Sequence, residues 1–124
     1  MLARYQMKRG ARASQLPAGH RIDTRKHTHH ILRPTPAMVS AYLAHPTSAT
    51  WAVFRRAYLA ELAARFHRDR GPFDAIADEA RRSDVYLGCS CPTELNPDVH
   101  HCHTYLALRF MRERYPDLEV AFPA

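Results

Sequence analysis

Apolar and polar positions alternate in two short segments near the N-terminus, which is the pattern of half-buried strands. The first runs from Leu2 to Met7 and the second from His20 to Arg25, with a basic turn region between them. Residues 84–88 form an apolar segment without alternation and predict a short strand buried on both faces, as in parallel sheets. Residues 118–122 predict a final strand.

Helical spacing of apolar residues predicts four helices. They cover about residues 36–45, 51–66, 72–80 and 98–115. Thr35 and Pro36 are suited to the N-cap and first position of the first helix, and Pro46 stops it. Asp98 is the expected N-cap of the last helix.

The order of these elements predicts the α/β class and a single domain over residues 1–124. The expected architecture is a small, three-layer, mostly parallel sheet flanked by helices on both faces, which is Rossmann-like. Sheets of this kind bind ligands outside the carboxyl ends of their strands. Cys89 lies at such an end, and so does His27 if the second strand forms.

Composition narrows the classes of function. The chain has 124 residues, and no apolar run approaches the roughly 20 residues of a membrane span. The N-terminus lacks the apolar run of a signal peptide, so cytoplasmic residence is expected. The net charge of +6 suits an anionic partner such as nucleic acid, a nucleotide or phosphate, and equally a solvated basic surface.

Residues 89–103 hold all three cysteines of the chain and three of its histidines. Cys89, Cys91 and Cys102, completed by His101 or His103, form a possible tetrahedral set for zinc or iron. Cys-x-Cys is tighter than the usual spacing of zinc knuckles. The segment therefore indicates a metal site without the pattern of a free-standing zinc module.

The same segment also fits thiol chemistry. Cys102 lies near the start of a helix, where unpaired N–H groups favour a thiolate, and His101 and His103 flank it as proton carriers. Cys89 is then a candidate resolving thiol. Packing is the third interpretation, because Cys102, Leu106 and Phe110 share one helix face.

Two further groups of polar residues lie at the end of the second predicted strand and just after it. His27, His29 and His30 are candidates for metal ligands or acid–base groups, or form an exposed histidine-rich loop. Asp23 and Arg25 point to the same face of a strand, where they form an ion pair or hold a phosphate or carboxylate.

These motifs resemble a known family. Tyr86–Cys91 and His101–Thr104 are similar to the pattern of domain of unknown function 488, whose members end a buried strand with a Cys-containing loop and open the next helix with Cys-His. Ile22–Arg25 resembles that family's Asp-x-Arg segment. The Cys-x-Cys…Cys-His form is also similar to domain of unknown function 4326. The resemblance covers about residues 20–115. Thr104 stands where an Arg usually follows Cys-His, and the loop between Cys91 and Cys102 is long.

The resemblance implies a small cytoplasmic α/β protein and no established reaction. It implies a cleft formed by five residues: Asp23, Arg25, Cys89, Cys102 and His103.

Three hypotheses follow from the sequence. The first is a Cys/His site that binds zinc or iron, or carries thiol chemistry on a small anionic substrate. In it Cys102 is the ligand or nucleophile, Cys89 and Cys91 are co-ligands or resolving thiols, and Arg25 orients the anion. The second is a nucleic-acid-binding accessory protein with structural cysteines. The third is a partner-binding domain without chemistry of its own.

Overall fold

Three parallel strands form the sheet of the computed structural model, which describes residues 1–124. They are β1 (Leu2–Gln6), β2 (His20–Asp23) and β3 (Val85–Cys89), in the order β1-β3-β2. Leu2 and His20 both pair with Val85, so β3 is the central strand and its carboxyl end lies between two neighbours. The α/β class and the parallel sheet predicted from the sequence are confirmed.

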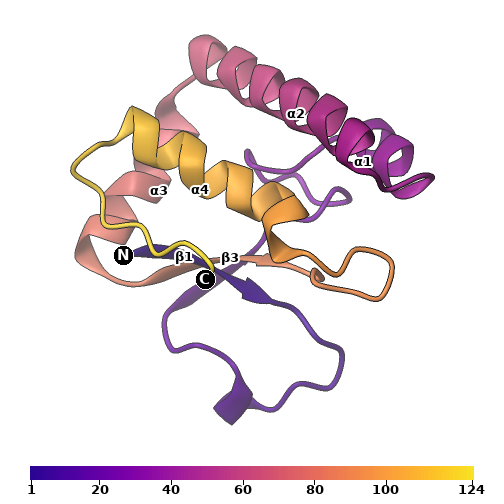
Figure 1. Ribbon diagram of the computed structural model, residues 1–124. Coiled ribbons are helices and arrows are strands. Elements are labelled where there is room, and N and C mark those ends of the chain that lie inside the picture. The colour runs from indigo at the N-terminus through magenta and orange to yellow at the C-terminus, as the bar shows by residue number, and fades with distance from the viewer.

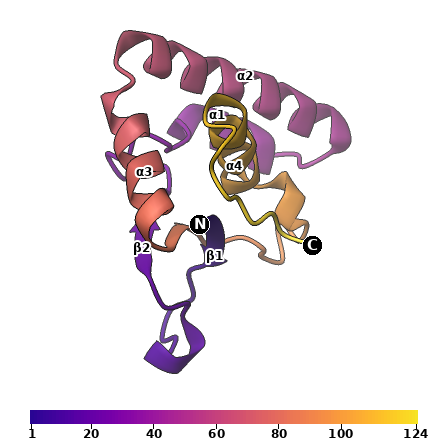
Figure 2. The same ribbon diagram turned by 90° about the vertical axis from the view of Figure 1, so that its left-hand side faces the viewer.

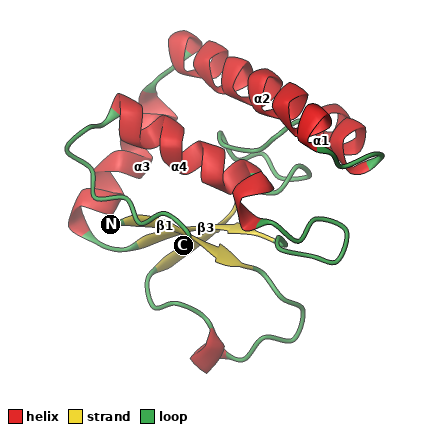
Figure 3. Cartoon of the chain, in the orientation of Figure 1, coloured by secondary structure: helices red, strands yellow, loops and turns green.

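Four helices accompany the sheet: α1 (Pro36–Leu43), α2 (Ser48–Arg68), α3 (Gly71–Arg82) and α4 (His103–Arg114). Thr35 caps α1 as predicted, because its side chain accepts a hydrogen bond from the backbone N–H of Met38. Two short 3-10 turns, η1 (Ala13–Gln15) and η2 (Val99–His101), lie in the connections between these elements. Figure 3 shows helical segments in red and loops in green.

The helices lie on one side of the sheet in two tiers (Figures 1 and 2). Helices α3 and α4 cover the sheet, and α1 and α2 lie beyond α4. The segment between β1 and β2 lies on the opposite side. Tyr5, Tyr86, Arg21 and Asp23 point to that side, and these polar or partly exposed side chains do not form an apolar face that a helix would cover.

One hydrophobic cluster of 20 buried residues joins the sheet to the helices. Val85 and Leu87 of β3 are fully buried in it, together with Leu2 of β1. Helix α2 contributes a buried stripe that includes Trp51, as its spacing predicts. None of the helices combines the length and the apolar character that a membrane crossing requires.

Two predicted elements differ from the structure. Residues 118–122 form a single parallel bridge from Val120 to Leu2 instead of a strand, since Pro123, which has no N–H, follows directly. Asp98 caps η2 and not the last α-helix, because its carboxylate accepts from the backbone N–H of His100. Helix α4 begins four residues later, with Cys102 at its N-cap position.

Candidate functional site

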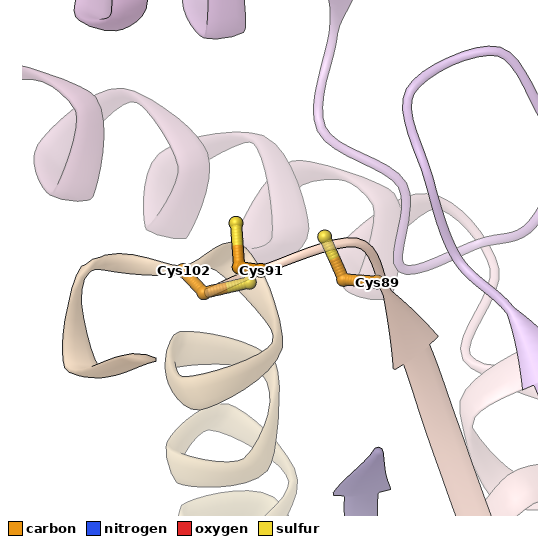
Figure 4. Close-up of side chains that lie close together, drawn as sticks. All are labelled: Cys89, Cys91 and Cys102. Carbon is orange, nitrogen blue, oxygen red and sulfur yellow. The ribbon is translucent and has the colours of Figure 1, made fainter. Parts of the chain in front are cut away.

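Three cysteines from different elements converge at the carboxyl end of the central strand. Cys89 is the last residue of β3, Cys91 follows in the loop, and Cys102 is the N-cap of α4. Their Sγ atoms all lie within 4.8 Å of one another (Figure 4). All three are free thiols, and Cys89 and Cys102 are buried. We call these three residues the thiol cluster.

Asn96 holds the return loop (residues 90–101) that brings Cys91 back toward Cys102. Its side chain is only 5 % exposed. Asn96 Nδ2 donates to the carbonyl of His101 at 2.7 Å and to Cys91 Sγ at 3.5 Å. Asn96 Oδ1 accepts from the Tyr42 hydroxyl at 3.0 Å. A single buried amide thus links α1 to both ends of the loop.

Arg4 and Thr104 form a relay to the sulfur of Cys102. Arg4 Nε donates to Thr104 Oγ1 at 2.9 Å, and that hydroxyl donates to Cys102 Sγ at 3.2 Å. Arg4 Nη2 also donates to the carbonyl of Cys91 at 2.7 Å. A guanidinium from β1 thus contacts Thr104, the residue that stands where the resemblance led us to expect an Arg.

His103 is buried beside the thiol cluster with a defined tautomer. The Thr24 hydroxyl donates to the carbonyl of Gly88, so His103 Nε2, 2.9 Å from Thr24 Oγ1, is the donor to that hydroxyl. The other nitrogen, Nδ1, lies 3.9 Å from Cys102 Sγ. His103 thus faces the cluster with the nitrogen that its buried hydrogen bond leaves free.

The three thiols differ in pKa. Hydrogen bonds from Cys89 and Cys91 hold the pKa of Cys102 well below its usual range, and His103 adds to this effect. Those same bonds raise the pKa of Cys89 and of Cys91, because each keeps its proton to donate to Cys102. The first negative charge of the cluster is therefore carried by Cys102.

A cavity of about 320 Å³ adjoins the cluster, and all three cysteines line it. Tyr42, Trp51 and Phe54 supply aromatic walls. The segment that follows β2 also lines the cavity, with Arg25 and Lys26 among its residues. No Asp or Glu is among the 17 lining residues. The site is thus a largely apolar cavity whose lining also includes three thiols and two cationic side chains.

The remaining predicted ligand, His101, lines the same cavity outside the group of three sulfurs. Its ring stacks on Trp51 at a centroid distance of 4.9 Å, and its Nε2 lies 3.9 Å from Asp98 Oδ2. The structure brings together the three predicted sulfur ligands, and it places this imidazole against α2.

Asp23, the last residue of β2, and Arg25 form a two-bonded ion pair. Arg25 Nε and Nη2 donate to the two carboxylate oxygens of Asp23 at 3.0 and 2.8 Å. These hydrogen bonds lower the pKa of Asp23 and raise that of Arg25. Arg25 lines the cavity, whereas Asp23 does not.

The three histidines after β2 are separated by the structure. His27 lines the cavity and lies 3.9 Å from a carboxylate oxygen of Asp23, while His29 is exposed. His30 is partly buried, and its Nδ1 accepts from the backbone N–H of Leu32 at 3.1 Å.

Sequence reasoning missed four residues that support the site: Arg4, Gln6, Thr24 and Asn96. Gln6 Nε2 donates to the carbonyls of Ser90 and Pro92, so it holds the chain on both sides of Cys91. Arg4 and Gln6 lie on the same face of β1 as the buried Leu2. Polar residues on the covered face of a strand were the available signal for two of the four.

The chemistry of this arrangement is that of sulfur ligands. Three close cysteines from the thiol cluster could hold a metal ion, and thiolates favour zinc, iron and other thiophilic metals. A tetrahedral ion held by three sulfurs retains one position for a further ligand.

Comparisons with known proteins agree with the resemblance seen in the sequence. The model of a family described as the active DUF488-N3 subclade matches residues 6–115, which include every residue of the thiol cluster. No curated protein and no solved structure gives a significant match. Since the matched region spans most of the chain, the protein belongs to the DUF488 family, within its active N3 subclade.

Proposed function

We propose that the thiol cluster is a metal centre that binds zinc or iron through three sulfurs and presents an open coordination position to the cavity. The observation that carries the proposal is the convergence of three Sγ atoms within 4.8 Å from a strand end, a loop and a helix start. Bound there, the metal would supply Lewis-acid activation of a small ligand in the cavity.

The spacing of the sulfurs supports this assignment. With Zn–S bonds of about 2.3 Å, the sulfurs of a tetrahedral site lie roughly 3.8 Å apart. The cluster therefore needs only a small contraction to enclose an ion. Small side-chain movements can supply it, because Cys91 lies in a loop and is not fully buried.

The hydrogen bonds around the sulfurs support it as well. Thr104 donates to Cys102 Sγ and Asn96 donates to Cys91 Sγ, so two of the sulfurs have donors that offset the charge of a thiolate. Free thiols in such a cluster persist in a reducing compartment, which fits a cytoplasmic protein.

Metal titration of the full chain tests the proposal. Cobalt(II) should bind at one ion per chain and give the sulfur-to-metal charge-transfer absorption of thiolate ligands, and zinc should displace it. Cys89→Ser, Cys91→Ser and Cys102→Ser should each weaken binding at least about tenfold, because each removes a ligand. Ser90→Ala, between two of the ligands, is the matched control and should bind normally.

A second candidate function rests on the lowered pKa of Cys102 and its position beside His103. Cys102 has a lowered pKa and lies beside His103, which is the arrangement of a nucleophilic thiolate. This candidate predicts a metal-free protein in which one cysteine, Cys102, is alkylated by iodoacetamide much faster than the other two at neutral pH. Metal binding with uniform protection of all three thiols would exclude it in favour of the metal centre.

A further inference from the structure

We propose that the cavity beside the thiol cluster binds a small organic anion, with an apolar ring-sized body among the aromatic walls and its acid group at Lys26. The inference rests on the proposed function, because it names the class of ligand that the metal centre would act on. Four properties carry it: the walls of the cavity, its cations, the charge expected at the metal centre, and the size of the cavity.

The walls are apolar and rigid. Trp51 is stacked on Phe54 with ring centroids 5.1 Å apart, and Tyr42 meets Trp51 edge-on at 5.5 Å. Val39 and Leu43 of α1 complete this side of the cavity. Interlocked rings of this kind form a surface that keeps its shape, and it is suited to the body of a ring-bearing ligand rather than to a sugar or a bare ion.

The charges of the cavity favour an anion. Of the cations that line it, Arg25 is neutralised by its two hydrogen bonds to Asp23. Lys26 is exposed and has no carboxylate within 4.0 Å. With no acidic residue among the lining side chains, Lys26 is an uncompensated positive charge at the cavity.

The positions of the charges give the ligand a direction. Lys26 lies on the segment after β2, whereas the three cysteines lie at the end of β3, in the return loop and at the start of α4. Three thiolates around a divalent ion carry a net negative charge, which repels an acid group from that side. The acid group is therefore drawn to Lys26 rather than to the sulfurs.

The size of the cavity bounds the ligand. A volume of about 320 Å³ is at the lower end for small-molecule sites, which run from roughly 300 to 1,000 Å³. One or two fused rings with a single acid group fill such a space, and a dinucleotide cofactor does not fit in it. Carboxylates and phosphate monoesters of this size share the required chemistry.

Binding of matched probes to the full chain tests the inference. The probes are naphthoate, its uncharged analogue naphthamide, naphthyl phosphate and inorganic phosphate. The chain has a single tryptophan, so the indole N–H resonance of Trp51 reports occupancy of the cavity while calorimetry gives the affinity. We expect naphthoate or naphthyl phosphate to shift this resonance and to bind more tightly than naphthamide. Which of the two anions binds better identifies a carboxylate or a phosphate ligand.

Lys26→Gln should weaken binding of the anionic probes roughly two- to fivefold, the range of an exposed ion pair, and leave naphthamide unchanged. Lys8→Gln removes a lysine outside the cavity and is the control. Naphthamide binding as tightly as naphthoate, inorganic phosphate binding as tightly as naphthyl phosphate, or no shift of the indole resonance would each overturn the inference.

A variant with Cys89, Cys91 and Cys102 all replaced by serine separates this inference from the metal centre. We expect it to bind the anionic probes without binding metal. Probe binding without metal binding by the unaltered chain would refute the metal centre and leave the ligand class standing. If probe binding requires the metal and is not weakened by Lys26→Gln, the acid group binds to the ion and the proposed position of the acid group at Lys26 is wrong.

Discussion

Thr104 connects a charged side chain to the most acidic sulfur of the site. Its hydroxyl accepts from Arg4 Nε and donates to Cys102 Sγ, and the residue is fully buried. Such a bond stabilises a thiolate over a thiol, and it also fixes the orientation of the side chain that bears it. The identity of this residue therefore affects both stability and the affinity of the site for metal.

Thr104→Val keeps the size and branching of the side chain and removes the hydroxyl. We expect the free energy of unfolding of the metal-free protein to fall by about 1–3 kcal/mol, because Arg4 Nε and Cys102 Sγ both lose a partner. Urea denaturation measures this change. Thr104→Ser keeps the hydroxyl and should retain the metal affinity of the unaltered protein. Equal affinities for the valine and serine variants would contradict the relay.

His30 gives the stability of the protein a pH dependence. Partial burial lowers its pKa from 6.5 to about 4, and the nearby His103 and Arg33 add to this effect. Between these values the unfolded chain binds a proton that the folded chain does not. The contribution of His30 to the free energy of unfolding is therefore highest above about pH 6.5, and it decreases as the pH falls toward 4.

Replacing this histidine with glutamine should flatten the decrease in stability between about pH 7 and about pH 5, as measured by urea denaturation at each pH. His29→Gln alters the exposed neighbour one position earlier and is the control. An acid decrease of the same size in His30→Gln and in the unaltered protein would show that another group is responsible.

The return loop decides whether the cysteines meet. Cys91 and Cys102 are separated in the sequence by this loop. Asn96 holds its two ends together through hydrogen bonds to Cys91 Sγ and the carbonyl of His101, and it also bonds to Tyr42 of α1. The sequence showed that the loop between Cys91 and Cys102 is long. It did not reveal the buried amide, because an Asn between two prolines is also typical of a surface turn.

Asn96→Ala should loosen the loop while the rest of the fold persists. We expect amide hydrogen exchange across residues 90–101 to accelerate and metal affinity to fall about 10- to 100-fold, the usual effect of losing a group that orients ligands. Tyr42→Phe removes only one of the bonds to Asn96 and should cause a smaller change. Unchanged exchange in the loop of Asn96→Ala would refute its role.

Errors in the predicted elements have local causes. Residues 118–122 contain the apolar residues of a strand, but only Val120 pairs, since Ala121 is the last residue whose N–H bonds to β1. Asp98 is a suitable N-cap by composition and caps a 3-10 turn, so the α-helix begins at His103. Helix periodicity does not distinguish a capped turn from the first turn of a longer helix.

At the scale of the whole molecule, the sequence predicted the three strands of the sheet, the four helices and the strand end that carries the cluster. It predicted helices on both faces of the sheet, and the structure has them in two tiers on one face (Figure 2). Strand pairing is a long-range property, and local periodicity carries no information about which face a helix covers. The contact of Thr24 with His103 depends on that tertiary arrangement, so no local pattern revealed it.

Metal binding should stabilise the entire fold, because the cluster joins β3, the return loop and α4. An ion that binds the folded chain alone at 100 times its dissociation constant adds about 2.7 kcal/mol. Thermal unfolding should therefore shift to higher temperature with zinc and return with a chelator. The variant with three serines should not respond. An equal response of that variant would place the ion elsewhere on the chain.

Binding of nucleic acid stays a prediction from the net charge of +6. Several arginines are paired within the chain, among them Arg25 with Asp23, Arg70 with Asp74 and Arg81 with Asp117. Retention on a polyanion column that weakens steeply with salt would support it. Elution at low salt would indicate that the net positive charge belongs to a solvated surface that does not bind nucleic acid.

X-ray absorption at the zinc edge of the zinc-loaded full chain tests the metal centre most directly. We expect one zinc per chain, with three sulfur neighbours at about 2.3 Å and one lighter neighbour, nitrogen or oxygen, in the remaining position. That lighter neighbour should change when an anionic ligand enters the cavity. A coordination shell dominated by nitrogen and oxygen, or a protein that takes up no zinc, would refute the three-sulfur metal centre.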